Sequence, residues 1–214
     1  KIETLIRRRI RERIPMAYLL KEAWLGEHPF YVDKRVIVPR SFIAELLRDR
    51  LAPWLRREPR SALDLCAGSG CLAVLLALAF EKARVDAADL SSAALQVSRI
   101  NIKKHGVAQR VRAIRSDLFE SLGTRRYDLI VSNPPYVTAR SMQKLPKEYR
   151  HEPALALAAG ALLAAPVTVM FTEALAVAPS SSVTVTVAVN VPEFVYACAG
   201  LCVVDVAPSP KFHE

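Results

Sequence analysis

Four consecutive residues, Asn133, Pro134, Pro135 and Tyr136, follow an apolar run and carry groups that can hold a planar amino group. The Asn133 side chain offers one carbonyl acceptor, and the carbonyl of Pro134 offers a second one in a loop that the two prolines stiffen. Tyr136 supplies a flat face on which an amide or a base can stack. This chemistry suits a side-chain amide or the exocyclic amine of a base, whereas an isolated Asn-Pro-Pro is also a common turn after a strand.

A glycine loop upstream predicts a nucleotide site. The stretch Asp64-Leu65-Cys66-Ala67-Gly68-Ser69-Gly70 leads from a predicted strand into a helix, and its glycines allow a ligand to approach the backbone there. Gly68, Gly70 and Ala73 also fit the fingerprint of dinucleotide-binding folds. Asp89 closes the next predicted strand, where a carboxylate can accept both ribose hydroxyls, so either interpretation predicts an adenosine-type ligand.

Strands and helices alternate after residue 61, which predicts the element order that would position these residues. We expect strands over 62–66, 83–89, 110–115 and 127–132, with helices over 72–80 and from Ser91 to about His105. Such alternation produces parallel strands with right-handed crossovers and places ligands at the carboxyl ends of the strands. Asp117 and the loop starting at Asn133 would then join the glycine loop and Asp89 at one edge of the sheet.

The segments on either side of this unit are shorter and less regular. Residues 2–13 predict an amphipathic helix that ends before Pro15, and residues 29–39 predict a β-hairpin centred on Asp33 and Lys34. Ser41 can cap a following helix whose buried stripe would be Phe42, Ile43, Leu46, Leu47 and Leu51. In residues 160–214, alternating valines predict a strand over 183–191, a second strand is expected over 201–206, and we expect no site there.

The bulk composition narrows the class of protein. The chain has 214 residues, is 52% hydrophobic and carries a net charge of +9, which favours an acidic partner such as nucleic acid or a ribonucleoprotein. Its four cysteines lack metal-ligand spacing and predict small core residues in a reducing compartment, with no metal site. The start of the chain has no signal-peptide pattern and we expect no membrane span, so a cytoplasmic location is predicted.

Together the motifs resemble the class I S-adenosylmethionine methyltransferases that modify amino nitrogens, over roughly residues 15–160. The resemblance implies a Rossmann-like α/β sheet with a small N-terminal β-hairpin and helix unit, residues 1–57, before a methyltransferase domain, residues 58–214. It implies that S-adenosylmethionine contacts Asp64, the Cys66–Gly70 loop (Cys66, Ala67, Gly68, Ser69 and Gly70), Asp89, Asp117, Leu118 and Asn133. Asn133, Pro134 and Tyr136 would act in catalysis, and Pro135, Arg40 and Ser41 would help them to bind the substrate.

Stretches outside these motifs resemble one subfamily, the protein-glutamine N5-methyltransferases. They include Arg13–Leu19, Phe30–Asp33 and His151–Leu155, and Pro39-Arg40-Ser41 is closer to the branch that methylates a glutamine of the third large-subunit ribosomal protein. The sister branch acts on peptide chain release factors and generally has Pro-Asp-Thr after the shared Pro-Arg. The resemblance therefore implies a ribosomal-protein substrate, with ribosomal RNA nearby, and it implies that residues 2–13 are the end of a helical N-terminal domain.

Two other functions fit the same residues. A DNA or RNA methyltransferase acting on adenine N6 or another base amine could use Asn133 to Tyr136 in the same way, although we find no segment for recognising a flipped base. A non-catalytic module that binds a nucleotide and docks on RNA would also be basic, but Asp89 and Asn133 favour an enzyme.

Overall fold

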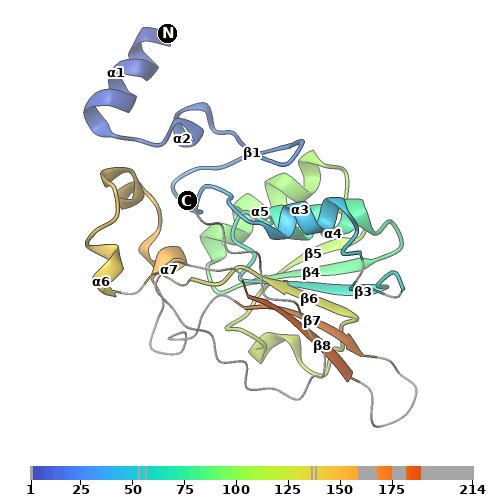
Figure 1. The fold of residues 1–214 in the computed structure, drawn as a ribbon. Coiled ribbons are helices and arrows are strands. Elements are labelled where there is room, and N and C mark those ends of the chain that lie inside the picture. The colour runs from blue at the N-terminus through green and yellow to red at the C-terminus, as the bar shows by residue number, and fades with distance from the viewer. Residues whose placement is uncertain are drawn as a thin grey trace, which may run out of the picture.

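A parallel sheet forms the centre of the computed structural model, which describes residues 2–52, 54–55, 57–135, 137, 139–158, 168–174 and 182–188 (Figure 1). Its strands are β3 (Ser61–Leu65), β4 (Arg84–Asp89), β5 (Val111–Arg115) and β6 (Leu129–Ser132), in the order β5-β4-β3-β6. All neighbouring pairs are parallel, which confirms the predicted α/β alternation. The chain moves outward from β3 to β5 and then returns to β6 on the other side of β3. This reversal marks the carboxyl ends of β3 and β6 as the place for a ligand.

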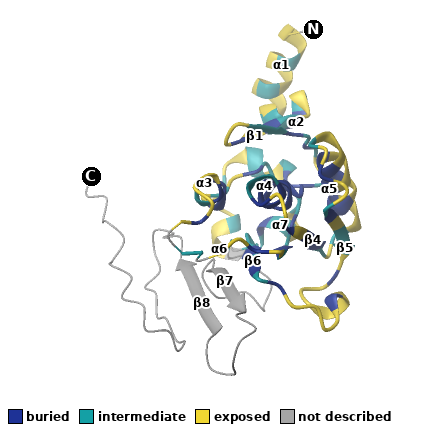
Figure 2. Cartoon of the chain, turned by 90° about the vertical axis from the view of Figure 1, so that its right-hand side faces the viewer, coloured by how far each residue is buried: buried dark blue, intermediate teal, exposed yellow. Residues whose placement is uncertain are grey.

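Helices α4 (Cys71–Ala79) and α5 (Ser92–Lys104) connect the first strands, as predicted. The Ser91 hydroxyl caps α5 by accepting a hydrogen bond from the Ala94 N–H at 3.2 Å. Seven of the nine residues of α4 are buried, because this apolar helix is enclosed by the sheet, α3 and α5 (Figure 2). The core thus fixes the direction in which the glycine loop leaves β3.

The N-terminal segment corrects one prediction. After α1 (Ile2–Glu12) and α2 (Met16–Leu20), the antiparallel hairpin consists of β1 (Ala23–Leu25) and β2 (His28–Phe30), whereas we expected it over 29–39. The predicted turn at Asp33 does form, but the Asp33 carboxylate binds the backbone N–H and guanidinium of Arg35. The Tyr31 backbone pairs with the Asn101 side chain instead of a second strand. Residues 31–39 are therefore an irregular segment that is held by α5.

Helix α3 (Ile43–Arg48) follows Ser41, whose hydroxyl accepts the Ile43 N–H at 3.2 Å. Ile43, Leu47 and Leu51 are buried and Leu46 packs against them, which confirms most of the predicted stripe. Phe42 is 63% exposed, so its predicted burial is wrong. It precedes the first helical residue and does not share the inward face of the helix.

The chain after β6 forms α6 (Ala139–Met142), the 3₁₀ helix η2 (Lys147–His151) and α7 (Ala154–Leu157). Strands β7 (Thr168–Ala174) and β8 (Ser182–Ala188) pair antiparallel, and β7 lies beside β6 (Figure 1). Strand β8 confirms the first part of the strand predicted over 183–191, and β7 was not predicted. The strand expected over 201–206 lies outside the described residues. Within the described ranges, no helix is long and apolar enough to cross a membrane.

Candidate active site at the carboxyl ends of the strands

A small cavity of about 30 Å³ brings together residues from segments far apart in the sequence. Seven residues expected in the site line it: Arg40, Ser41, Cys66, Ala67, Gly68, Ser69 and Asn133. The cavity is much smaller than the several hundred Å³ of a typical ligand pocket, so a nucleoside-sized ligand would lie across its mouth. A larger hollow of about 400 Å³ lies at the opposite ends of the strands and contains none of the predicted site residues. The chemistry of the side chains therefore locates the candidate site better than the size of the hollows does.

The glycine loop takes its shape from left-handed backbone conformations. Cys66, Gly68 and Gly70 have φ values of 62°, 55° and 73°. A Cβ atom on Gly70 would lie 2.3 Å from the Ser98 hydroxyl oxygen, so this glycine allows α4 and α5 to pack closely. A Cβ atom on Gly68 would meet no atom within 4 Å. The space beside Gly68 is therefore open to a ligand that approaches the backbone.

Asp89, the last residue of β4, binds this loop directly. One carboxylate oxygen accepts the Gly68 N–H at 2.7 Å, and the other accepts the Ser91 N–H at 2.8 Å. Each oxygen keeps a second lone pair for a ligand hydroxyl. Desolvation raises the pKa of Asp89 above its ordinary value, while the two backbone hydrogen bonds act to lower it. The donors and acceptors present fit the ribose of an adenosine-type cofactor.

Asp64 stabilises the glycine loop from the protein interior. Its side chain is fully buried, and one oxygen accepts the Ala73 N–H at 2.9 Å in the first turn of α4. The other oxygen is buried and has no hydrogen-bond partner in the described part of the chain. Burial raises the pKa of Asp64 to about 8, and the nearby charge of Asp89 adds to this effect. Asp64 therefore holds the helix start, and its predicted contact with a cofactor stays a prediction.

The end of β5 adds the third predicted segment. The Ser116 N–H donates to the Asp89 carbonyl at 3.1 Å, which places Asp117 beside the end of β4. Asp117 is exposed, and Leu118 is 36% exposed with a positive φ of 44°. Ser116 is buried and accepts the Ser121 N–H, which closes the turn after the strand. Asp117 and Leu118 thus border the same edge of the sheet as Asp89, but they do not line the small cavity.

Asn133 follows β6, which is tied to β3 by a hydrogen bond from the Ser132 hydroxyl to the Leu65 carbonyl. Its side-chain NH2 donates to the Arg40 carbonyl at 3.4 Å. This contact orients the amide so that its oxygen is left to accept a hydrogen bond from a substrate. Pro134 and Pro135 are partly exposed beside it. Tyr136, for which we expected a stacking role, lies outside the described residues.

An ion pair between exposed Arg40 and buried Glu152 supports the Arg40 segment and was not predicted. The Arg40 guanidinium pairs with Glu152, whose carboxylate is buried, and it also lies 4.7 Å from the centre of the Tyr149 ring. Desolvation raises the pKa of Glu152, whereas the charge and hydrogen bond of Arg40 act to lower it. Glu152 was part of the stretch used for the resemblance, but its partner is 112 residues away and no local pattern indicates the pairing. Arg40 therefore anchors the segment that orients Asn133.

Asn101 is a second residue that the sequence analysis missed. It is fully buried in α5, and its NH2 donates to the carbonyls of Ser69 and Tyr31 at 2.9 and 3.0 Å. Its oxygen accepts the Tyr31 N–H at 2.7 Å. A buried amide in an otherwise apolar helix face is a usable signal, because such a group needs partners. Asn101 joins the N-terminal segment to the glycine loop.

The thiols near the loop do not act as nucleophiles at neutral pH. Burial raises the pKa of Cys66 to about 11 and that of Cys71 to about 12, so both remain protonated. Among the residues that the structure describes, no three His, Cys, Asp or Glu side chains form a group that could hold a metal ion. The site can thus bind and orient polar groups through Asp89, Asn133 and backbone atoms.

Curated proteins with similar sequences share one name. A protein of Bordetella pertussis named ribosomal protein uL3 glutamine methyltransferase is 57% identical over 163 residues, covering 75% of this chain and 55% of that protein. Proteins of the same name are 56% identical in Neisseria meningitidis serogroup A and 54% identical in Burkholderia pseudomallei, covering 75% and 73% of this chain and 54% of each relative. The chain thus spans about half the length of these curated relatives.

A solved structure and a family profile also match. The catalytic domain of hMettl16 in complex with MAT2A 3'UTR hairpin 6 has 13% identity and a TM-score of 0.46, covering 62% of this chain and 51% of that chain. The sequence profile named methyltransferase small domain matches residues 44–162, which include the glycine loop, Asp89 and Asn133. That match covers more than half of the chain. The chain therefore belongs to the methyltransferase small domain family.

Proposed function

We propose that this chain forms part of an S-adenosylmethionine-dependent enzyme that methylates a glutamine side-chain amide of ribosomal protein uL3. The family supports methyl transfer, and relatives at 54–57% identity carry the name of this activity. The observation that carries the proposal is the orientation of Asn133, whose NH2 is bound to the Arg40 carbonyl and whose oxygen is left for a substrate.

The proposed cofactor would lie along the ends of β3, β4 and β5. S-adenosylmethionine, when bound, supplies a methyl group on a positively charged sulfur. Asp89 would accept its ribose hydroxyls, and the open side of Gly68 would admit it to the loop backbone. Asp117 and Leu118 would border the adenine, and Cys66 to Gly70 would pass its methionine part. Asp64 would stabilise this loop from the protein interior, through the hydrogen bond that its carboxylate accepts from the Ala73 N–H.

The substrate amide is a poor nucleophile, because its nitrogen lone pair is delocalised into the carbonyl. The Asn133 oxygen and the Pro134 carbonyl would accept its two N–H groups and turn the nitrogen toward the methyl carbon. Tyr136 would pack on the amide plane beside Pro135, and Arg40 and Ser41 would bound the opening. These groups also favour the positive charge that develops on nitrogen in the transition state.

The step needs no strong base at the nitrogen. The amide nitrogen forms a bond to the methyl carbon as the carbon–sulfur bond breaks, and the nitrogen then loses a proton to water. One oxygen of Glu152 is paired with Arg40, so the carboxylate helps to hold the opening. Orientation by Asn133 and the loop would then provide most of the acceleration.

Replacing Asn133 tests this account. Asn133→Ala is expected to lower methyl transfer to purified uL3 about a hundredfold, the usual effect of removing one preorganised polar group. Thermal unfolding should change little, because the side chain is partly exposed and makes one long hydrogen bond. Gln109→Ala, an exposed amide at the other edge of the sheet, is the matched control and should keep full turnover. Normal turnover in Asn133→Ala would contradict the assigned role.

A further inference from the structure

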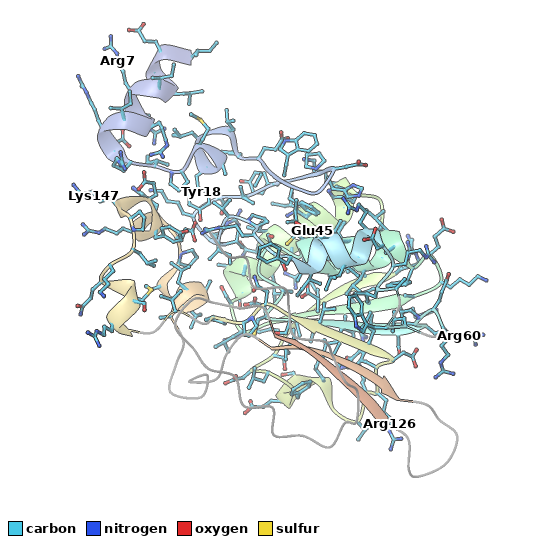
Figure 3. All side chains as sticks on the ribbon, viewed as in Figure 1. Arg7, Tyr18, Glu45, Arg60, Arg126 and Lys147 are labelled. Carbon is cyan, nitrogen blue, oxygen red and sulfur yellow. The ribbon has the colours of Figure 1, made fainter. Side chains whose placement is uncertain are left out.

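The hollow at the amino ends of the strands is lined by arginines. It measures about 400 Å³ and is bordered by Arg84, Arg110, Arg112, Arg125 and Arg126, with Asp86 as the one lining carboxylate among the described residues. These residues precede or begin β4, β5 and β6, so the hollow lies at the edge of the sheet opposite to Asn133 and Asp89. Figure 3 shows Arg126 and Arg60 on the side away from Tyr18 and Lys147.

The carboxylate in this hollow is already neutralised. Asp86 accepts hydrogen bonds from the Arg112 guanidinium at 3.0–3.1 Å and from the Tyr127 hydroxyl at 2.7 Å. The Arg125 guanidinium lies 3.9 Å from the same carboxylate. Asp86 lines the hollow but is buried and bound by these groups, so it presents less negative charge to an incoming ligand than an exposed carboxylate would.

The remaining arginines leave an excess of positive charge. Arg110 donates to the backbone carbonyls of Phe80 and Ala83, which are neutral groups. Arg84 and Arg126 are exposed, and no described residue forms a hydrogen bond or ion pair with either guanidinium. Guanidinium groups present paired N–H donors that match the oxygens of a phosphate. A cluster of arginines around a hollow concentrates the positive electrostatic potential there, and this potential attracts a polyanion.

We propose that this surface, defined by Arg84, Arg110, Arg112, Arg125 and Arg126, binds the phosphodiester backbone of RNA. An acidic protein segment is the other partner that suits the charge, but several guanidinium forks around one hollow fit closely spaced phosphates better. The choice of RNA over DNA rests on the proposed function, because the proposed substrate is a ribosomal protein and ribosomal proteins bind RNA. The surface lies opposite to the candidate active site, so RNA and the substrate amide can bind at the same time.

Fluorescence anisotropy with a short fluorescein-labelled RNA duplex tests the proposal. The test variant is R84E/R126E, in which the charges of the two unpaired arginines are reversed. We expect this variant to keep the fold. It is expected to weaken binding at least about tenfold and to lower the slope of log affinity against log salt by about 2. R84Q/R126Q should show a smaller loss in the same direction. Arg99→Glu, an exposed reversal on α5, should have little effect, whereas R84E or R126E alone, which change the charge by the same amount, should each weaken binding.

Four results would overturn the proposal. They are unchanged RNA affinity in R84E/R126E, an equal loss in Arg99→Glu, displacement of RNA by poly-glutamate, and tighter binding to a DNA duplex of the same sequence. Methyl transfer to free uL3, measured on the same proteins without RNA, should be the same in R84E/R126E and in the parent protein. If the parent protein does not methylate uL3, the proposed function is wrong. The RNA-binding proposal is decided separately, by the anisotropy measurement.

Discussion

Asp89 connects two parts of the proposed cofactor site, because its carboxylate binds the glycine loop with one oxygen and the start of α5 with the other. These bonds fix the direction of the remaining lone pairs before a ligand arrives. A charged acceptor held in this way contributes more to binding than a mobile surface carboxylate.

We expect Asp89→Asn to weaken S-adenosylmethionine binding about ten- to a hundredfold, because a charge-assisted hydrogen bond is worth about 1.5–3 kcal/mol. Isothermal titration calorimetry measures this change. Asp49→Asn, an exposed carboxylate at the end of α3, should bind the cofactor normally. Equal affinity in the parent protein and Asp89→Asn would remove Asp89 from the site.

Asp64 gives the protein a pH-dependent stability. Its pKa in the folded state is about 8, compared with an ordinary value of 3.8, so the unfolded chain loses this proton at lower pH than the folded protein does. The contribution of Asp64 to the free energy of unfolding should therefore fall as pH rises from about 4 to 8, by up to about 1.4 kcal/mol per pH unit.

Asp64→Asn should remove this dependence, since the amide keeps an acceptor for the Ala73 N–H and does not ionise. Urea unfolding at pH 5, 6.5 and 8 provides the measurement. We expect the stability of Asp64→Asn relative to the parent protein to increase with pH across this range. Parallel stability curves for the two proteins would show that the buried carboxyl does not titrate between these pH values.

The sequence predicted most of the residues at this site but not their partners. The residues expected in the glycine loop do lie close to Asn133. The alternation of strands and helices predicts this, because it places the carboxyl ends of parallel strands at one edge of the sheet. The Arg40–Glu152 pair joins residues that are 112 positions apart in the sequence. The hydrogen bonds of Asn101 join residues that are 32 and 70 positions apart. Such contacts depend on how elements pack, and no local pattern encodes them.

At the scale of elements, Gly70 controls the approach of α4 and α5. Gly70→Ala should destabilise the protein by about 2–5 kcal/mol, since it adds a left-handed backbone penalty to a clash with Ser98. Gly106→Ala also has a positive φ but no atom near its added Cβ, so it should cost only about 1–2 kcal/mol. Urea unfolding of both variants measures the difference. Equal losses would show that the close packing at Gly70 contributes nothing.

The parallel strands were predictable because they are short and contain buried apolar residues, and helix signals follow β3 and β4. The hairpin was misplaced because residues 29–39 have strand-forming side chains but bind α5 through Asn101. The turn at Asp33 was predicted correctly. The Asp33 carboxylate stabilises it by accepting a hydrogen bond from the Arg35 N–H. A tertiary partner, absent from the local sequence, decided between strand and irregular backbone.

At the scale of the whole molecule, the two edges of the sheet have different chemistry. The carboxyl ends of the strands gather Asp89, the glycine loop and Asn133, whereas the amino ends gather exposed arginines. This separation would let one surface position a ribosomal protein's RNA while the other methylates its glutamine. The division into residues 1–57 and 58–214 stays a prediction, as does a cytoplasmic location.

We expect the methyl group to reach a glutamine amide of uL3. The protein, purified uL3 and methyl-labelled S-adenosylmethionine would be incubated together, and the products would be mapped by tandem mass spectrometry. We expect one added methyl group on the side-chain nitrogen of a glutamine in uL3, and Asn133→Ala should give little product. Methyl groups on nucleic acid bases, or on another amino-acid type of uL3, would contradict it.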